Sequence, residues 1–338
     1  MNQRPNILDA LRRNGHVLDP QAHLAPLSGG VSSEIYLVDD SGRKFVVKRA
    51  LPRLKVKDDW FADVRRNLSE RDYMACVSNI IPGVVPQLYF SCPDEGYFGM
   101  EFLDEGFTNW KDLLLAGETR IRHAELAGNI VGEIHRRTTC ADGLRRQFNT
   151  TTTFHQLRVE PYLLTTGARH PGLRAIFDAE ARRIEATHEA LVHGDFSPKN
   201  ILINGDRMVL LDCEVACYGD PAFDVSFLLS HLFLKSLYHA PKVFNFQDMI
   251  DVFWRTYEEG CSSLDANQIE ERLLSLLPML LLARVDGKSP VEYLTSEKRE
   301  FIRVFVYKTL QSPGDCLADL RDMWFAEIYT SGFIEADS

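Results

Sequence analysis

The segment LVHGDFSPKNILI, residues 191–203, constrains the fold of this chain more than any other stretch. It places His193, Asp195 and Asn200 at H-x-D-x-x-x-x-N spacing between two apolar runs. Glycine, aspartate, proline and asparagine are ordinary turn residues, so a plain turn is one interpretation. A functional loop is the other, because turns rarely show this spacing directly before a pair of hydrophobic strands. The remaining motifs of the chain decide between these two interpretations.

A hairpin and an acidic segment follow this loop. The apolar runs ILI and MVLLD, joined by NGDR, predict two short strands. Asp212 ends the second strand, twelve residues after Asn200, so the two side chains are expected at neighbouring ends of the hairpin. Oxygen ligands of this kind suit Mg²⁺. Asp224 then begins an apolar helix, either as its N-cap or in a supporting role toward the loop.

The first third of the chain has strand and turn signals, and the rest is mainly helical. EIYLV, KFVVKRA, VPQLYFSC and YFGMEFL predict four strands, and a major helix is expected from about Asp58 to about Asn79. Beyond Gly106, apolar residues recur every three or four positions, as in helices. The sequence therefore predicts an α+β protein with a small, mainly β lobe at 1–103 and a larger helical lobe at 104–338.

Lys48 stands inside the apolar strand FVVKRA, where a buried ammonium group is costly unless it is paired. Glu70 is its expected partner, because the following helix would turn Glu70 inward, one turn before Met74. Asp63 or Asp72 would take this place under another helix phase. A solvated lysine and a surface glutamate are the alternative interpretation.

Two weaker signals flank Lys48. In LSGGVSSEIYLV, paired glycines allow backbone N–H groups to approach a phosphate, with Gly30, Ser32 and Ser33 as candidate contacts. This segment is not G-x-G-x-x-G, and a plain hairpin turn is the alternative. YFGMEFLDEG lies where the two lobes are expected to meet, and a connecting strand there can offer its backbone to an adenine edge. An ordinary edge strand fits this second segment equally well.

Taken together, HGDFSPKN, LLDCEVA and GDPAFDVSFLLSHL resemble the aminoglycoside phosphotransferase and choline kinase superfamily. Its members are small-molecule kinases with a bilobal, protein-kinase-like fold, and CEVACYG is also similar to methylthioribose kinases. The resemblance covers about residues 27–231 through motifs. It implies transfer of the γ-phosphate of ATP to a small-molecule hydroxyl, with ATP and Mg²⁺ as cofactors. A nucleotide-binding pseudokinase with a regulatory or interaction role is the alternative function.

The resemblance also implies roles for individual residues. Asp195 would be the catalytic base, and Asn200 and Asp212 would bind Mg²⁺. Lys48 would contact the α- and β-phosphates and be held by Glu70. The full set of candidate nucleotide contacts is Gly30, Ser32, Ser33, Lys48, Glu70, Met100, Glu101 and Leu103.

Three departures from protein kinases narrow the choice of phosphate acceptor. Ser197 stands where protein kinases have a catalytic-loop lysine, and the metal motif is Asp-Cys-Glu rather than Asp-Phe-Gly. Only eleven residues separate Asp212 from Asp224, too few for the activation segment that binds a peptide. A protein substrate is therefore disfavoured. Lys199 either touches the γ-phosphate or faces solvent.

The acceptor pocket is expected between the 193–200 loop and the C-terminal helices. In LLARVDGKSPVEYL, polar residues follow a very apolar run, and Arg284, Asp286 and Lys288 can bind a polyol or pair with an acid. A helix end capped by Gly287 is the alternative interpretation. Weaker candidates for the same pocket are Glu214, Asp220 and His155.

Composition limits the partners and the location. The net charge of -10 disfavours nucleic acids and favours neutral or cationic small molecules, unless a local pocket overrides it. The expected acceptor is a sugar, a thiosugar, an amino alcohol or an aminoglycoside. The apolar run at 273–283 contains Pro278 and is too short to span a bilayer, so a buried helix is expected there. With no secretory signal, the prediction is a soluble, cytoplasmic protein; seven scattered cysteines argue against a disulfide framework.

Overall fold

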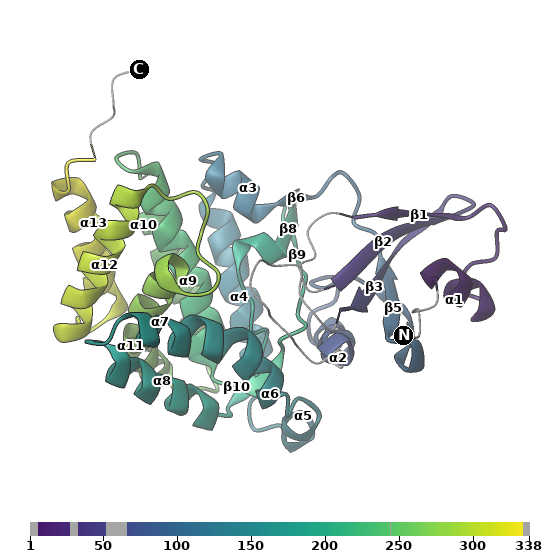
Figure 1. Ribbon diagram of the computed structural model, residues 1–338, viewed down its shortest axis with the longest axis horizontal. Helices are drawn as coiled ribbons and strands as arrows, with labels where there is room; N and C mark the ends of the chain where they lie inside the picture. Colours follow the sequence, from purple (N-terminus) through teal and green to yellow (C-terminus); the bar gives the residue numbers. More distant parts are fainter. Residues whose placement is uncertain (1–5, 28–32, 52–65, 244, 334–338) are drawn as a thin grey trace.

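The computed structural model describes residues 6–27, 33–51, 66–243 and 245–333. Two lobes lie side by side: a small lobe built on a sheet and a larger lobe of helices (Figure 1). The predicted fold class, an α+β bilobal protein-kinase-like fold, is confirmed. The elements of the small lobe are α1 (Ile7–Arg13), β1 (His23–Pro26), β2 (Ser33–Asp40), β3 (Arg43–Ala50), α2 (Arg66–Ile80), β4 (Leu88–Cys92), the 3₁₀ turn η1 (Pro93–Glu95) and β5 (Tyr97–Glu101).

The small lobe is an antiparallel sheet in the order β1-β2-β3-β5-β4. Side chains alternate between its two faces, so neighbouring residues of β3 enter different cores. Val47 packs in the apolar cluster that includes Leu11 of α1, whereas Val46 packs in the cluster that includes Met74 of α2. By the same alternation Lys48 lies on the α2 side of the sheet.

The strands predicted around Lys48 and before the lobe boundary correspond to β2, β3, β4 and β5, and one helix, α1, precedes them in the described part of the chain. The major helix of this lobe is α2, described from Arg66. Its predicted N-cap, Asp58, and the alternative Lys48 partner Asp63 lie outside the described residues. Within α2, Glu70 and Met74 are buried as the helix phase predicts.

The larger lobe combines helices with short strands. Its elements are β6 (Thr108–Asn109), α3 (Trp110–Leu115), α4 (Ile121–Thr138), α5 (Asp142–Gln147), α6 (Thr151–Phe154), the π-helix η2 (His155–Leu164), α7 (Thr165–Arg169), α8 (Arg174–Ala186), β7 (Ala190–Val192), the 3₁₀ turn η3 (Pro198–Asn200), β8 (Ile201–Asn204), β9 (Arg207–Leu210), β10 (Cys217–Gly219), α9 (Pro221–His239), α10 (Phe246–Gly260), α11 (Ala266–Asp286), α12 (Ser296–Gln311) and α13 (Leu317–Thr330). The predicted ILI and MVLLD hairpin is β8–β9.

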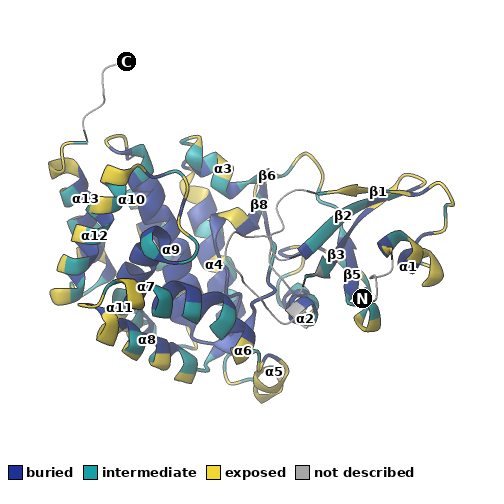
Figure 2. Ribbon diagram, viewed as in Figure 1, coloured by how far each residue is buried: buried dark blue, intermediate teal, exposed yellow. Residues whose placement is uncertain are grey.

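Helix α9 is the centre of this lobe: its residues are buried from Pro221 to Leu237, and other helices surround it (Figure 2). Helix α11 packs along it and contains the apolar run at 273–283, with Pro278 inside the helix, so the predicted buried helix is confirmed. No helix among the described residues is both long and apolar enough to cross a membrane.

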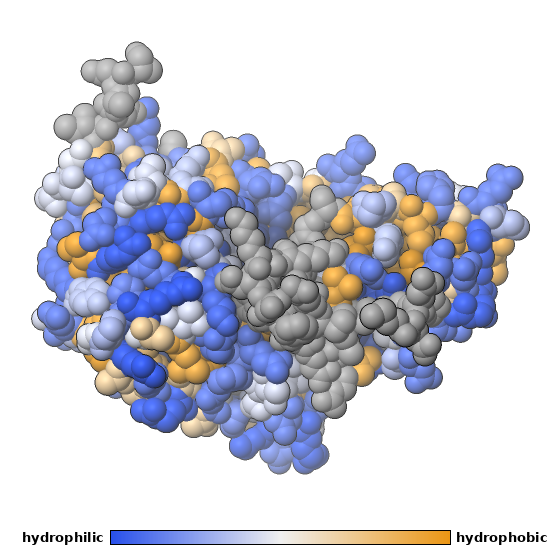
Figure 3. Space-filling view, in the orientation of Figure 1, coloured by the Kyte–Doolittle hydropathy of each residue, from blue (hydrophilic) through white to orange (hydrophobic). Residues whose placement is uncertain are grey.

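The surface differs from this interior. In the space-filling view, the visible face of the larger lobe is mainly hydrophilic, with scattered hydrophobic side chains (Figure 3). The seven cysteines are free thiols, as predicted, and Cys213 and Cys217 are buried in the core.

Helices α4 and α10 approach closely where α4 has glycine. A Cβ atom at Gly128 would lie 2.5 Å from the carbonyl oxygen of Phe253. We expect Gly128→Ala to lower the free energy of unfolding by about 1–3 kcal/mol, because α10 has to shift away from the new methyl group. Urea unfolding measures the change. Gly143→Ala is the matched control, since nothing lies within 4 Å of its added Cβ; equal stability of the two variants would contradict the close approach.

Candidate active site

The 193–200 loop runs from the end of β7 to β8 and is held by one carboxylate. Asp224, in the first turn of α9, accepts hydrogen bonds from the backbone N–H groups of His193 at 2.6 Å and Gly194 at 2.9 Å. Gly194 has φ +75°, and a Cβ there would lie 2.7 Å from the carbonyl oxygen of Val215. Only glycine fits this position without strain. Asp224 therefore fixes the loop rather than capping α9, whose N-cap is Asp220.

Asp195 is buried and paired on one side only. Its Oδ2 atom lies 3.0 Å from Arg158 Nη2 and 2.9 Å from Lys199 Nζ. Its Oδ1 atom is buried and has no hydrogen-bond partner among the described residues. Burial alone would raise the pKa of Asp195, but the charges of Arg158 and Lys199 outweigh it and lower that pKa below its usual value. The carboxylate is therefore ionised, and its Oδ1 atom is the oxygen left to accept a hydrogen bond from a donor group.

Lys48 lies between two carboxylates. Its Nζ atom is 2.8 Å from Glu70 and 2.5 Å from Asp212 Oδ1, while the lysine itself is buried. Burial acts to lower the pKa of Lys48, but the charges of Asp212, Glu70 and Glu214 raise it overall, so the ammonium stays charged. Burial raises the pKa of Glu70 to about 7, although Lys48 opposes this. The predicted partner of Lys48 is therefore Glu70, with Asp212 as a second one.

Asp212 follows β9 rather than ending it and has φ +60°, a left-handed conformation that is uncommon for a residue other than glycine. Its carboxylate, with those of Glu70 and Glu214, forms a group whose oxygen atoms lie within 4.8 Å of one another. Asn200 donates its Nδ2–H to the Asp195 carbonyl at 3.0 Å, which leaves the Asn200 amide oxygen as an acceptor. An oxygen-only donor set of carboxylates and an amide fits Mg²⁺.

A cavity of about 420 Å³ lies where the lobes meet. Asp195 is not among its lining residues, but its ion-pair partner Lys199 is. Several residues predicted from sequence line the cavity: Lys48, Glu70, Met100, Glu101, Leu103, Asn200 and Asp212. Apolar side chains line it as well: Leu27, Ile35, Val46, Met74, Phe102, Leu202 and Leu211. The cavity thus combines apolar walls, which suit a flat ring, with ammonium, carboxylate and amide groups. Gly30 and Ser32 lie outside the described residues, and Ser33 is buried at the start of β2.

The acceptor candidates at the end of α11 make polar contacts with other residues of the protein. Arg284 donates to the Tyr162 hydroxyl at 3.3 Å and to Ser289. Asp286 pairs with Arg303 at 2.8 Å and His170 at 2.9 Å, and Lys288 pairs with Glu160 at 2.7 Å. Gly287 is the C-cap of α11, and the next helix begins at Ser296.

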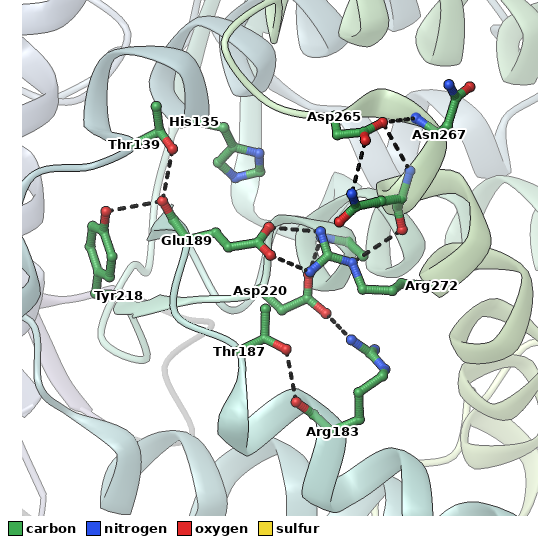
Figure 4. Close-up of polar contacts among 12 residues, drawn as sticks. His135, Thr139, Arg183, Thr187, Glu189, Tyr218, Asp220, Asp265, Asn267 and Arg272 are labelled. Atoms are coloured by element: carbon green, nitrogen blue, oxygen red, sulfur yellow. Dashed lines mark hydrogen bonds and ion pairs between the residues drawn. The ribbon is translucent and has the colours of Figure 1, made fainter.

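The weaker acceptor candidates are placed differently. Asp220 binds Arg183 at 2.6 Å and Arg272 at 3.4 Å, in an ion-pair network that also contains Glu189 (Figure 4). His155 pairs with Glu185 at 2.6 Å. Glu214, in contrast, is buried in the carboxylate group beside Lys48.

Sequence reasoning missed Arg158. This arginine, on η2, is buried; besides its ion pair with Asp195, its Nε atom donates to the Gly194 carbonyl at 2.5 Å. The signal was present in FHQLRVEPYLL, where a lone arginine in an apolar stretch needs a buried partner. Lys199, for which the sequence left two alternatives open, pairs with Asp195, and its side chain is 45% exposed.

The fold and this site define a kinase of protein-kinase-like architecture, and comparison with known proteins agrees. The phosphotransferase enzyme family matches residues 23–242, well over half of the chain, so the chain belongs to the phosphotransferase enzyme family. It is a small-molecule kinase. It is similar to a methylthioribose kinase from Exiguobacterium sibiricum, with 24% identity over 289 residues, which cover 76% of this chain and 73% of that relative.

Solved structures share the fold at low sequence identity. An amicoumacin kinase has a TM-score of 0.53 and 13% identity, and the match covers 95% of this chain and 98% of that one. An ethanolamine kinase from Plasmodium vivax has a TM-score of 0.50 and 13% identity, covering 93% and 85%. None of these comparisons supports the pseudokinase alternative.

The Asp224 contacts can be tested separately from catalysis. We expect Asp224→Asn to lower the free energy of unfolding by about 1–3 kcal/mol, because an amide offers one acceptor oxygen to two buried N–H groups. Chemical denaturation followed by tryptophan fluorescence gives the change. The control is Asp178→Asn on α8, whose ion pair with Arg174 is exposed; we expect a change within about 0.5 kcal/mol. A neutral Asp224→Asn variant would contradict the anchoring role.

Proposed function

We propose that this kinase transfers the γ-phosphate of ATP to a hydroxyl group of a small molecule such as a sugar, a thiosugar, an amino alcohol or an aminoglycoside. The observation that carries the proposal is the Oδ1 atom of buried Asp195, which has no hydrogen-bond partner among the described residues, while the Asp195 partner Lys199 lines the same cavity as Lys48, Asn200 and Asp212. The amicoumacin kinase of the same fold was solved with AMP-PNP and Ca²⁺, which supports nucleotide and metal in this cavity. Since ATP is the donor, we propose a cytoplasmic location.

The nucleotide lies between the lobes in this proposal, with residues 1–103 as the nucleotide-binding lobe and 104–338 as the lobe that carries the base, the metal ligands and the acceptor pocket. The adenine ring packs on the apolar walls formed by Val46, Met100 and Leu202, and it meets the backbone of Glu101 and Leu103. This arrangement turns the phosphates toward Lys48, whose ammonium group Glu70 holds in place.

Asp212 and the amide oxygen of Asn200 are the proposed Mg²⁺ ligands. When bound there, Mg²⁺ would neutralise charge on the phosphate oxygens. Lys48 and Lys199 both line the cavity and supply positive charge there. Since Lys199 is also paired with Asp195, it is placed to contact the transferred phosphoryl group.

Asp195 acts on the acceptor. Its Oδ1 atom accepts the proton of the substrate hydroxyl while the hydroxyl oxygen forms a bond to the γ-phosphorus. The bond between the γ-phosphorus and the bridging oxygen breaks, and ADP leaves with that electron pair. Arg158 holds the other carboxylate oxygen, so Oδ1 faces the acceptor in a fixed direction.

Replacement of Asp195 by asparagine tests the base. We expect Asp195→Asn to lower kcat by about 10²–10⁴-fold, because the amide cannot take up the proton, while the dissociation constant for Mg·ATP stays nearly unchanged. The assay is ADP release with a panel of aminoglycosides, amino alcohols, sugars and thiosugars. Asp206→Asn, in the exposed β8–β9 turn, is the control and should turn over normally. Near-normal turnover of Asp195→Asn would overturn the assignment.

A second substitution tests the metal ligand. We expect Mg²⁺ to strengthen ADP binding by the wild type. In Asp212→Asn most of this gain in affinity should be lost, since a charged ligand of the ion is removed. Titration calorimetry with ADP, with and without Mg²⁺, measures this difference in wild type and variant. Asp206→Asn again serves as control. Equal Mg²⁺ dependence in wild type and Asp212→Asn would exclude Asp212 as a ligand.

A further inference from the structure

A cluster of basic side chains lies inside the larger lobe, on one face of α9. Phe227, His231 and Lys235 follow one another at intervals of four residues, so they share one face of the helix. The His231 ring packs on Phe227, with ring centroids 5.5 Å apart. Arg284 of α11 lies near them, because it donates to the Tyr162 hydroxyl and the Tyr162 ring packs on Phe227 with ring centroids 5.4 Å apart. We call His231, Lys235 and Arg284 the basic cluster.

The basic cluster lacks a counter-charge at ion-pair distance among the described residues. Lys235 is fully buried, and neither its Nζ atom nor the His231 Nε2 atom has a hydrogen-bond partner there. Arg284 is 9% exposed, and its Nε atom is likewise unpaired in the described part of the chain. An unpaired buried cation costs several kcal/mol, and natural sequences keep such groups mainly at functional sites.

The surroundings of the basic cluster add polar groups but no carboxylate contact. The Lys235 Nζ atom lies 5.4 Å from the centre of the Tyr293 ring, whose buried hydroxyl also has no hydrogen-bond partner among the described residues. Glu292, the acid with the largest effect on Lys235, is itself paired with Lys111 at 2.6 Å. Burial and the charges of Arg284 and Lys111 lower the pKa of Lys235 to about 7, and a bound anion would restore its charge.

The basic cluster connects to the catalytic base through two aromatic side chains. Arg158, the partner of Asp195, lies over the Phe227 ring at 5.7 Å and near the Tyr162 ring at 5.8 Å. Tyr162 in turn accepts a hydrogen bond from Arg284. The contacts Asp195–Arg158, Arg158–Tyr162 and Tyr162–Arg284 therefore link the proposed base to the basic cluster.

We propose that the acceptor of this kinase carries an anionic group, a carboxylate or a phosphate, and that His231, Lys235 and Arg284 bind it. This inference rests on the proposed function for the hydroxyl end of the acceptor. It selects hydroxy acids, sugar acids or sugar phosphates over choline-like amino alcohols and aminoglycosides, whose positive charge the basic cluster repels. The net charge of -10 favours cationic partners, but the three basic side chains reverse this preference locally.

Anion binding tests this proposal without requiring turnover. Thermal unfolding is followed in the presence of saturating Mg·ADP, with malonate or inorganic phosphate added and with sodium chloride at equal ionic strength as the reference. We expect malonate, phosphate or both to raise Tm in a saturable way, and the one that binds more tightly tells a carboxylate site from a phosphate site. Gluconate should stabilise the protein more than the neutral polyol sorbitol. No gain over chloride, together with equal effects of gluconate and sorbitol, would overturn the proposal.

Lys235→Met is the decisive variant, because it keeps the apolar stem and removes the charge. Without anion, we expect its Tm to exceed that of the wild type, since a buried unpaired cation is lost; with anion, the stabilisation should weaken at least tenfold in apparent Kd. Lys235→Gln replaces it if the methionine variant does not fold. Lys308→Met, on the exposed side of α12, is the control and should retain full anion binding. Unchanged anion binding in Lys235→Met, or a lower Tm without anion, would mean that Lys235 has a structural role only.

The same measurements separate the two proposals. If Mg·ADP does not stabilise the protein, the proposed function fails, whatever the anions do. If Mg·ADP binds and a neutral or cationic acceptor is phosphorylated in preference to its acidic counterpart, the kinase proposal stands and the anionic acceptor is excluded.

Discussion

The Asp224 carboxylate is the contact on which the site depends. From the first turn of α9 it accepts hydrogen bonds from the backbone N–H groups of His193 and Gly194. These bonds fix the backbone from which Asp195 and Asn200 project. Because α9 is buried along almost its whole length, the anchor cannot shift without disturbing the core of the larger lobe. One helix thus holds the 193–200 loop at its N-terminal end and, further along, presents His231 and Lys235 on one face.

The sequence was sufficient for the parts of the site that depend on local spacing. Strand alternation and helix phase identified the Lys48–Glu70 pair, and the distance along the chain from Asn200 to Asp212 indicated a hairpin that brings both to one cavity. These features follow from the periods of helices and strands, which a single sequence carries. The nucleotide-contact roles of these residues remain predictions, as does the lobe boundary near residue 103.

Sequence could not supply contacts between distant helices. Arg158 and Asp195 are brought together by the packing of η2 against the catalytic loop, which no local pattern encodes. The same holds for Lys235. In the sequence it is a polar residue of an apolar helix, and only the structure shows that α11 brings Arg284 near it. For Arg284, Asp286 and Lys288, the motif marked a polar helix end correctly, but only the structure separates the interior Arg284 from the ion pairs of the other two. Charges are placed by tertiary packing, so their partners are the least predictable part of a site.

The ion pair between Lys48 and Asp212 has a consequence for motion. Lys48 belongs to a strand of the small lobe and Asp212 to the segment after β9 in the larger lobe, so this pair ties the two lobes together. Under the proposed function, a cation with Asp212 as ligand would compete with Lys48 for the same carboxylate, and the Lys48 charge would then be available to the phosphates. Nucleotide and metal would in that case be thermodynamically linked through one carboxylate that also joins the two lobes, and each would alter the affinity for the other by the same factor.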